Sequence, residues 1–294
     1  MEIKMRYKNP SVIAEIGCNH RGEMETAKEL IKTAAEFCKA PVVKFQKRNP
    51  RELLSPEQYN APHPNPIHAY GKTYGEHREN LEFSLDQHRE LKDYCLELGV
   101  VYSSSVWDMT SAKEIISLNP ELIKIPSAMN THVKMLSYIA DNFQGKIHVS
   151  TGMSTEEEND ALVKLFDKAG RGKDVVLYAC TSGYPVPFDE VTLLDIPDMI
   201  KRYGDSVGEI GFSGHHLGIA IDVAAYALGA TWIERHFTLD RTWKGTDHSA
   251  SLESDGLRKL VRNLDATYKA MNRKNGKLLD IEIEQRKKLK WSES

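Results

Sequence analysis

The sequence predicts an α/β fold, a (β/α)8 TIM barrel, and three observations lead to this prediction. The chain has 294 residues, and a barrel of this class needs about 250. Eight short runs rich in β-branched residues recur along the chain, and amphipathic stretches with helical spacing separate them. Eight strands that alternate with helices in this length favour a closed barrel over an open, doubly wound sheet.

Each expected strand is an apolar, β-branched run, and the helical pattern is clearest in Met24–Cys38 and Asp86–Leu98. We expect residues 1–280 to form one barrel domain and residues 281–294 to form a charged, solvated C-terminal tail. The expected strands are, in order, Val12–Gly17, Val42–Gln46, Val100–Ser105, Leu122–Ser127, Lys146–Thr151, Val175–Cys180, Glu209–Gly214 and Thr231–Phe237.

The connection after the second strand, residues 48–83, is too long for an ordinary βα loop. It contains five prolines and shows little periodicity, so we expect it to lack regular structure. Long connections inside a compact domain are usually functional. Because this one follows a barrel strand, we expect it to lie over the catalytic face, as a lid or a dimer contact.

Composition argues against several classes of protein. The formal net charge is -3, with acidic and basic residues mixed along the chain, so nucleic acid is not expected as a partner. The first residues, MEIKMRYKNP, lack the apolar stretch of a signal peptide, and no apolar run approaches the length of a membrane span. The widely spaced Cys18, Cys38, Cys95 and Cys180 predict free thiols, a reducing compartment and a cytoplasmic protein.

Charged side chains collect in and after the expected strands, where barrels carry their catalytic groups. Lys44, Lys124, Glu15 and Glu234 all lie within strands. A buried charge costs several kcal/mol unless it has a partner, so we predict ion pairs among them. The alternative is that these ion pairs only fill the interior of the barrel and have no catalytic role. That alternative would explain a single charged residue, but it explains the whole set less well.

These residue types predict two kinds of binding site. Lysine charge and hydroxyl geometry suit a phosphate and a carboxylate, so Lys44 and Lys124 predict an anion pocket. His215 and His236 end consecutive strands and are candidates to share one divalent metal, although a hydrogen-bonded core histidine is the alternative for each. His216 and His248 are weaker candidates, because strand alternation points His216 away from its neighbour. The hydroxyl and amide candidates at strand ends are Gln46, Ser103, Ser104, Ser105, Ser127, Thr151, Thr181, Ser182 and Ser213.

Eight motifs in order resemble the sialic acid (N-acetylneuraminate) synthase family. They are AEIGCNHRG, VVKFQ, IKIPS, STGM, YACTSGYP, GFSGHH, WIERHFTLDR and GTDHSASLE. The resemblance runs through about Asp280, and the order of the motifs is more specific than any one of them.

The resemblance implies roles for individual residues. It places phosphoenolpyruvate on Lys44, Lys124, Ser127, Thr151 and Ser213, with Gln46 and Ser182 beside them. It implies a divalent metal, Mn2+ with Mg2+ or Co2+ as alternatives, on His215 and His236. It places the acceptor sugar on Glu15, Tyr184 and Asp247.

The chain also departs from the family's pattern. Met129, followed by Asn130, stands where many members carry a glutamate. Many members also have a C-terminal antifreeze-like domain that donates an arginine to the partner subunit, and we expect this chain to lack it. The resemblance further implies a homodimer.

The implied reaction condenses phosphoenolpyruvate with an N-acyl hexosamine-type aldose to a 3-deoxy-2-nonulosonate and phosphate. In it, Lys44 and Lys124 hold charge, and Glu15 or Asp247 serves as acid or base. We expect an unphosphorylated acceptor, because no basic run marks a second phosphate site. The alternatives are a synthase of 3-deoxy-octulosonate or heptulosonate phosphates, a Schiff-base aldolase with Lys44 or Lys124 as nucleophile, and an inactive barrel that serves as a scaffold.

Overall fold

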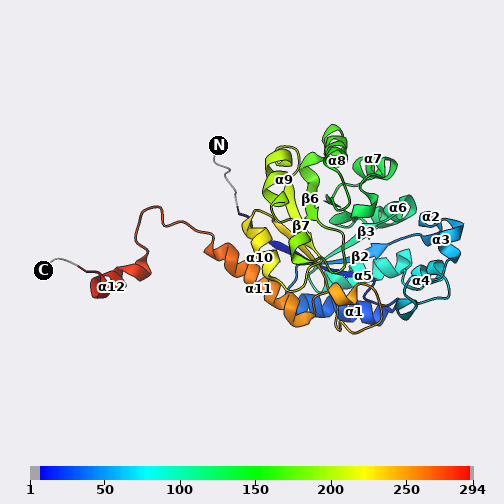
Figure 1. Ribbon diagram of the computed structural model, residues 1–294, viewed down its shortest axis with the longest axis horizontal. Helices are drawn as coiled ribbons and strands as arrows, with labels where there is room; N and C mark the ends of the chain where they lie inside the picture. Colours follow the sequence, from blue (N-terminus) through cyan, green and yellow to red (C-terminus); the bar gives the residue numbers. More distant parts are fainter. Residues whose placement is uncertain (1–6, 292–294) are drawn as a thin grey trace.

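Eight parallel strands close into a barrel in sequence order, β1 to β8, with helices around it (Figure 1). The computed structural model describes residues 7–291. It confirms the predicted (β/α)8 barrel, and each strand ends within two residues of its predicted limits. The strands are β1 Ser11–Gly17, β2 Val42–Lys47, β3 Val101–Val106, β4 Leu122–Ile125, β5 Lys146–Ser150, β6 Val175–Cys180, β7 Glu209–Gly214 and β8 Trp232–His236.

The helices form the outer layer of the barrel. Expected helix Met24–Cys38 is α1 Met24–Lys32 followed by a π-helical turn, η1 Thr33–Phe37, and Asp86–Leu98 is α5 Leu85–Glu97. The others around the barrel are α6 Met109–Ser117, α7 Val133–Asn142, α8 Glu156–Lys168, α9 Asp195–Tyr203, α10 Ala220–Ala227 and α11 Ser254–Ala270. Short 3₁₀ turns are η3 Ser127–Met129, η4 Gly172–Asp174, η5 Phe188–Glu190 and η6 His248–Ala250.

Strand alternation divides the sheet into two faces. Outward residues pack with the helices in one large core, whereas Ile13, Val42, Leu122 and Trp232 belong to a separate apolar cluster inside the barrel. Two residues further along these strands, the inward positions become polar, because a strand returns to the same face every second residue. The apolar layer thus supports a polar layer at the carboxyl end of the barrel.

His216 lies on the outer face, as the alternation predicts. Its Nε2 lies 3.1 Å from Nη1 of Arg235, which donates to Asp222 of α10 at 2.5 Å. His216, Asp222 and Arg235 are fully buried between sheet and helix. His216 therefore points away from His215, as predicted, and packs between the sheet and α10.

The prediction that residues 48–83 lack regular structure is wrong. The segment contains α2 Pro50–Leu53, α3 Pro56–Asn60, η2 Pro66–His68 and α4 Tyr74–Asn80. Asn49, Ser55 and Asn65 accept hydrogen bonds at the N-termini of the first three, and a proline follows each cap. Proline at the first helical position is favourable, so these prolines begin helices and do not interrupt the segment.

The C-terminal part of the chain leaves the barrel after α11. Residues 281–289 of the predicted tail lie in α12 Asp280–Leu289, which stands apart from the barrel (Figure 1). Its Ile281 and Leu289 are 78% and 79% exposed. Residues 292–294 of the predicted tail, and residues 1–6 of the predicted barrel domain, lie outside the described residues. Within residues 7–291, no helix combines the length and the apolar character that a bilayer crossing requires.

Candidate active site

Four buried charges, one each from β1, β2, β4 and β8, meet at the centre of the barrel. Lys44 Nζ lies 2.5 Å from Oε2 of Glu15 and 3.5 Å from Oε1 of Glu234. Lys124 Nζ lies 3.0 Å from Oε2 of Glu234. None of the four residues is more than 6% exposed. The structure therefore confirms the predicted ion pairs and joins them into one network.

The network sets the charge of its members. Burial works against the charged form of Lys44, but Glu15 and Glu234 outweigh it and raise the pKa of this lysine. Burial lowers the pKa of Lys124, and its single carboxylate partner does not fully offset this. Burial also opposes ionisation of Glu234, yet the two lysines hold its pKa well below the usual range. Glu234 is thus a buried anion that two lysines share.

An aromatic pair lies under Lys124 and was not predicted. The Nζ of Lys124 lies 3.5 Å from the ring centroid of Tyr178. The Tyr178 hydroxyl lies 2.7 Å from Nδ1 of His148, whose other ring nitrogen is buried without a hydrogen-bond partner. Cation–π contact with a desolvated ammonium is worth about 2 kcal/mol. Tyr178 lies two positions along β6 from Val176, on the inward face. This strand alternation could have identified it from the sequence as an inward residue.

Gln46 and Ser213 extend the network to the mouth of the barrel. Gln46 Nε2 donates to Oε1 of Glu15 at 2.8 Å, and Ser213 Oγ donates to Oε1 of Glu234 at 3.2 Å. Gly17 makes room for the first contact, since a Cβ there would lie 2.8 Å from Gln46 Nε2. Its φ of +53° also belongs to the left-handed region that glycine tolerates.

Three predicted hydroxyl residues lie together beside this network. The backbone N–H of Gly152 donates to Oγ of Ser127 at 3.1 Å, and a Cβ on Gly152 would lie 2.4 Å from Oγ of Ser182. The hydroxyl of Thr151 donates to the backbone oxygen of Tyr178 at 2.8 Å. Ser127 lies in η3 and not in β4, because the strand ends at Ile125 before Pro126. A cavity of about 1080 Å³ adjoins Thr151 and Ser182 between α8 and α9.

The two predicted metal ligands face each other at the mouth. The ring centroids of His215 and His236 are 5.6 Å apart, and both side chains are buried. Nδ1 of His215 lies 3.0 Å from the backbone oxygen of Thr181, which leaves Nε2 free. Burial lowers the pKa of His215 to about 3, so the ring is neutral near pH 7. A neutral imidazole whose second nitrogen is held by a carbonyl is the usual form of a metal-binding histidine.

The donor set fits an open metal site. Nδ1 of His236 is buried without a hydrogen-bond partner, 4.0 Å from Oδ2 of Asp247. Between residues 7 and 291, no group of three or more His, Cys, Asp and Glu side chains is arranged to hold a metal. A metal on His215 and His236 would therefore have positions left for water or substrate.

The predicted acceptor residues lie around His236 but differ in exposure: Glu15 is its register partner on β1, the Tyr184 ring centroid lies 6.0 Å from its ring, and Oδ2 of Asp247 lies 4.0 Å from its Nδ1. Tyr184 is 55% exposed, and its ring centroid lies 4.3 Å from that of His215. Asp247 lies beside His236 in the loop between β8 and α11. Glu15, by contrast, is within the central network and is only 1% exposed. Met129 packs against the core, and Asn130 donates to the backbone oxygen of Ser150 at 3.0 Å.

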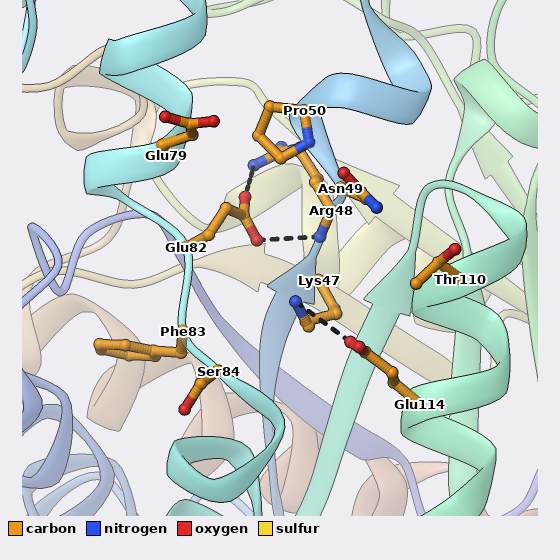
Figure 2. A pocket seen from close by; sticks show the side chains of 10 residues that line it. All are labelled: Lys47, Arg48, Asn49, Pro50, Glu79, Glu82, Phe83, Ser84, Thr110 and Glu114. Atoms are coloured by element: carbon orange, nitrogen blue, oxygen red, sulfur yellow. Dashed lines mark hydrogen bonds and ion pairs between the residues drawn. The ribbon is translucent and has the colours of Figure 1, made fainter.

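Arg48 is a buried cation that the sequence prediction missed. Its Nη1 donates to Sγ of Cys18 at 3.2 Å and lies 3.5 Å from Glu82, and its guanidinium also bonds Gln46. Figure 2 shows Glu82 reaching across to Arg48 beside a cavity of about 280 Å³, with Lys47 turned toward Glu114. Arg48 directly follows the last residue of β2. Its position at a strand end could have marked it in the sequence as a candidate site residue. It ties both ends of segment 48–83 to the site.

Thr181 and His248, two further candidates, form hydrogen bonds with neighbouring residues. Thr181 orients His215 through its backbone and donates its hydroxyl to the backbone of Glu190. Nδ1 of His248 lies 2.8 Å from the hydroxyl of Thr238. The four cysteines are free.

The chain matches known proteins along most of its length. The family model described as the NeuB family matches residues 30–276. The N-acetylneuraminate-9-phosphate synthase of Mus musculus is 37% identical over 278 residues, which cover 95% of this chain and 76% of the relative. The N,N'-diacetyllegionaminic acid synthase of Campylobacter jejuni is 35% identical over 90% of this chain and 78% of its own length.

A solved structure shows the same fold. The crystal structure of N-acetylneuraminic acid (sialic acid) synthetase from Leptospira borgpetersenii, in complex with citrate, superposes with a TM-score of 0.80 and 27% sequence identity. The match covers 96% of this chain and 93% of that one. The chain described here belongs to the NeuB family.

Proposed function

We propose that the chain condenses phosphoenolpyruvate with an N-acyl hexosamine-type aldose to give a 3-deoxy-2-nonulosonate and inorganic phosphate. The family and its named synthases support the reaction class. The observation that carries the proposal is the pair of buried lysines that share Glu234 at the carboxyl end of the barrel. Two lysine charges beside a row of hydroxyls suit a substrate that carries both a phosphate and a carboxylate.

Charge balance supports a metal in the same site. The two central lysines and two central glutamates sum to zero charge. A phosphate monoester brings about -1.5 to -2 charges near neutral pH, and the carboxylate adds another. We propose that His215 and His236 hold a divalent metal, Mn2+ with Mg2+ or Co2+ as alternatives. Such an ion would supply positive charge and Lewis acidity toward the acceptor's aldehyde.

The chain's own residues then bind and position the substrates. Lys44 and Lys124 hold the anionic groups of phosphoenolpyruvate, and Ser127 and Ser213 donate to its oxygens. Carbon 3 attacks the aldehyde carbon, water adds at carbon 2, and phosphate leaves with cleavage of its C–O bond. Because the lysines are fixed before substrate binds, little reorganisation is needed when charge develops at carbon 2.

The geometry favours Asp247 over Glu15 as the group that takes a proton from the attacking water and passes it to the alkoxide formed from the acceptor's aldehyde. Both oxygens of Glu15 are engaged, one by Lys44 and one by Gln46. The Asp247 side chain is 20% exposed beside His236. Burial favours its neutral form, but surrounding cations and hydrogen bonds outweigh this and lower its pKa, so it is ionised near pH 7. We assign Glu15 to positioning Lys44 and Asp247 to the acid–base step.

One observation supports a second candidate. The lowered pKa of Lys124 is a property of Schiff-base lysines, which react as neutral amines. Borohydride in the presence of pyruvate would trap such an adduct on Lys124. The proposed synthase forms no covalent adduct, so its mass stays unchanged in that experiment.

A labelling experiment tests the proposed reaction itself. In 18O water, the synthase incorporates one label at carbon 2 of the product and releases unlabelled phosphate. Label in the phosphate would mean that water attacks phosphorus, and the proposed chemistry would then be wrong. Lys44→Ala provides the control, because it removes a central charge and should suppress both products together.

Three further expectations remain predictions. These are the homodimer, the cytoplasmic location, and a lid or dimer role for residues 48–83. Gel filtration with light scattering tests the first and, applied to a variant shortened in that segment, part of the third.

A further inference from the structure

His148 is a buried histidine to which the proposed reaction gives no role. It lies in the middle of β5, where its register partner on β4 is Lys124, and it is fully buried inside the barrel. Its Nδ1 lies 2.7 Å from the hydroxyl of Tyr178, which is also fully buried. The Lys124 ammonium in turn lies 3.5 Å from the centroid of the Tyr178 ring. A chain of contacts therefore runs from His148 through Tyr178 to one of the two central lysines.

Close packing holds both rings of this chain. Gly211 is the register partner of Tyr178 on β7, and a Cβ there would lie only 2.6 Å from Cε1 of the tyrosine. The backbone of β7 thus lies directly against the Tyr178 ring. The His148 ring meets the Trp232 ring in a T-shaped arrangement with centroids 4.6 Å apart. The position of each ring is therefore built into the interior of the barrel.

The count of donors and acceptors sets the direction of the hydrogen bond between His148 and Tyr178. Burial, with Lys124 nearby, lowers the pKa of His148 well below its ordinary value, and burial raises the pKa of Tyr178, so both side chains are neutral near pH 7. If His148 donated, the Tyr178 proton and the His148 Nε2 lone pair would both lack a partner within residues 7–291. If Tyr178 donates, only the N–H at Nε2 lacks one. Since each unmet buried polar group costs free energy, Tyr178 is the donor and Nδ1 of His148 the acceptor.

Donation from the Tyr178 hydroxyl strengthens the contact on the face of its ring. A phenol that donates its proton carries more electron density on its oxygen and ring, and this density attracts a cation over the ring. The same hydrogen bond keeps the ring from turning away from the Lys124 ammonium. Support from the ring matters for this lysine, because burial lowers its pKa and its single carboxylate partner does not fully offset that effect.

We propose that His148 is a positioning residue for the condensation: by accepting the Tyr178 hydroxyl, it holds the ring that supports the Lys124 ammonium where phosphoenolpyruvate binds. This inference rests on the proposed function and adds a residue to it. His148 acts through Tyr178 and Lys124 and does not itself touch substrate. A histidine that only fills the barrel would have no specific effect on phosphoenolpyruvate.

A second histidine–tyrosine pair in the chain provides a matched control. Nδ1 of His88, on α5, lies 2.7 Å from the hydroxyl of Tyr102, on β3, and both residues are buried. This pair packs on the outer face of the sheet, where the rings of Phe45 and Phe83 lie against it. It reproduces the buried hydrogen bond without the lysine.

The direction of the bond can be measured without any substrate. In protein labelled with 15N at histidine, NMR distinguishes the protonated ring nitrogen from the unprotonated one, and His148→Asn identifies the signals of His148 by their loss. His148 should be neutral with its proton on Nε2, and Tyr178→Phe should shift the Nδ1 resonance. A proton on Nδ1 would overturn the inference, because His148 would then be the donor.

A double-mutant cycle tests the link to phosphoenolpyruvate. Phosphate release gives kcat and KM, and calorimetry gives the Kd of phosphoenolpyruvate. Tyr178→Phe and His148→Leu should each raise the KM and Kd for phosphoenolpyruvate about 3-fold, the loss expected for one buried hydrogen bond, without a change in kcat or in the KM of the acceptor. The double variant should show about the same 3-fold change and not the product of the two. His148→Asn keeps an acceptor near the Nδ1 position and should recover most of the loss, while Tyr102→Phe and His88→Leu should change neither constant.

The outcomes separate this inference from the proposed function. Effects that multiply in the double variant, or that the Tyr102 and His88 variants reproduce, overturn the positioning role and leave the synthase standing. An unchanged Kd in Tyr178→Phe overturns it too, whether or not His148→Leu folds. If no acceptor is turned over but the variants weaken phosphoenolpyruvate binding as expected, the positioning role holds and the reaction is wrong. If wild type does not bind phosphoenolpyruvate, both fail.

Discussion

Replacing Glu234 with glutamine removes the only carboxylate that pairs with Lys124 in the described part of the chain. Lys44 keeps Glu15 at 2.5 Å, so the damage falls mainly on Lys124. Removing one partner of a buried ion pair costs about 3–5 kcal/mol. Because the amide oxygen still accepts a hydrogen bond, we expect a loss near the lower limit, about 3 kcal/mol, which lowers Tm by roughly 6–9 °C in a chain of this size.

The loss should depend on pH with a defined sign. Burial already lowers the pKa of Lys124, and Glu234 is the partner that raises it. Without Glu234, the pKa of Lys124 in the folded state falls further. Over a wider pH range, Lys124 is then protonated in the unfolded chain and neutral in the folded chain. Stability rises with pH throughout such a range. The deficit of Glu234→Gln should therefore shrink between about pH 7 and about pH 9.

Urea unfolding followed by circular dichroism measures both effects. The matched control is Glu114→Gln, which breaks the Lys47–Glu114 pair at 3.3 Å, where the Glu114 side chain is 34% exposed. A pair this exposed contributes at most about 1 kcal/mol. If Glu234→Gln unfolds like wild type near pH 7, or if its deficit grows with pH, the account of the central network is refuted.

Further predictions concern the site around this network. Lys44→Ala and His236→Ala should each lower kcat/KM for phosphoenolpyruvate at least about 100-fold, and a change within a few-fold in phosphate release would contradict the assignment. Chelation should abolish turnover, and added Mn2+ should restore it. The His215→Ala variant should contain less Mn2+ than wild type by elemental analysis, and an unchanged metal content would rule out His215 as a ligand. Tyr178→Leu removes the ring face under a buried lysine and should raise KM for phosphoenolpyruvate about 10-fold with an unchanged circular dichroism spectrum. Arg48→Met leaves a buried carboxylate without its cation and should speed proteolysis within residues 48–83; an unchanged cleavage rate would show that the arginine does not hold the segment.

The barrel was predictable because local pattern and global fold agree. Each strand alternates between a helix-facing and an inward residue, and the inward positions carry Lys44, Lys124, Glu15 and Glu234. Charges at strand positions can be satisfied only by one another, so their pairing followed from the cost of burial. The register of the strands around the closed barrel decides which carboxylate each lysine contacts. That register cannot be read from the sequence.

The remaining features depend on contacts between distant segments. Tyr178 meets Lys124 only after the barrel closes, and Tyr70 meets Lys244 only after segment 48–83 docks. The short helices of segment 48–83 were not predicted for a different reason, because their signals are local. Asn49–Pro50 and Ser55–Pro56 are local helix-start signals, and counting prolines as helix breakers hid them.

Product analysis of the phosphoenolpyruvate reaction tests the central claim most directly. The protein is incubated with Mn2+, phosphoenolpyruvate and a panel of tetroses, pentoses and N-acyl hexosamines, each with and without phosphate, and the products are identified by mass. Phosphate release should require an N-acyl hexosamine and yield a nine-carbon 2-ulosonate. Seven- or eight-carbon products from the smaller sugars, or no release with any acceptor, would contradict it.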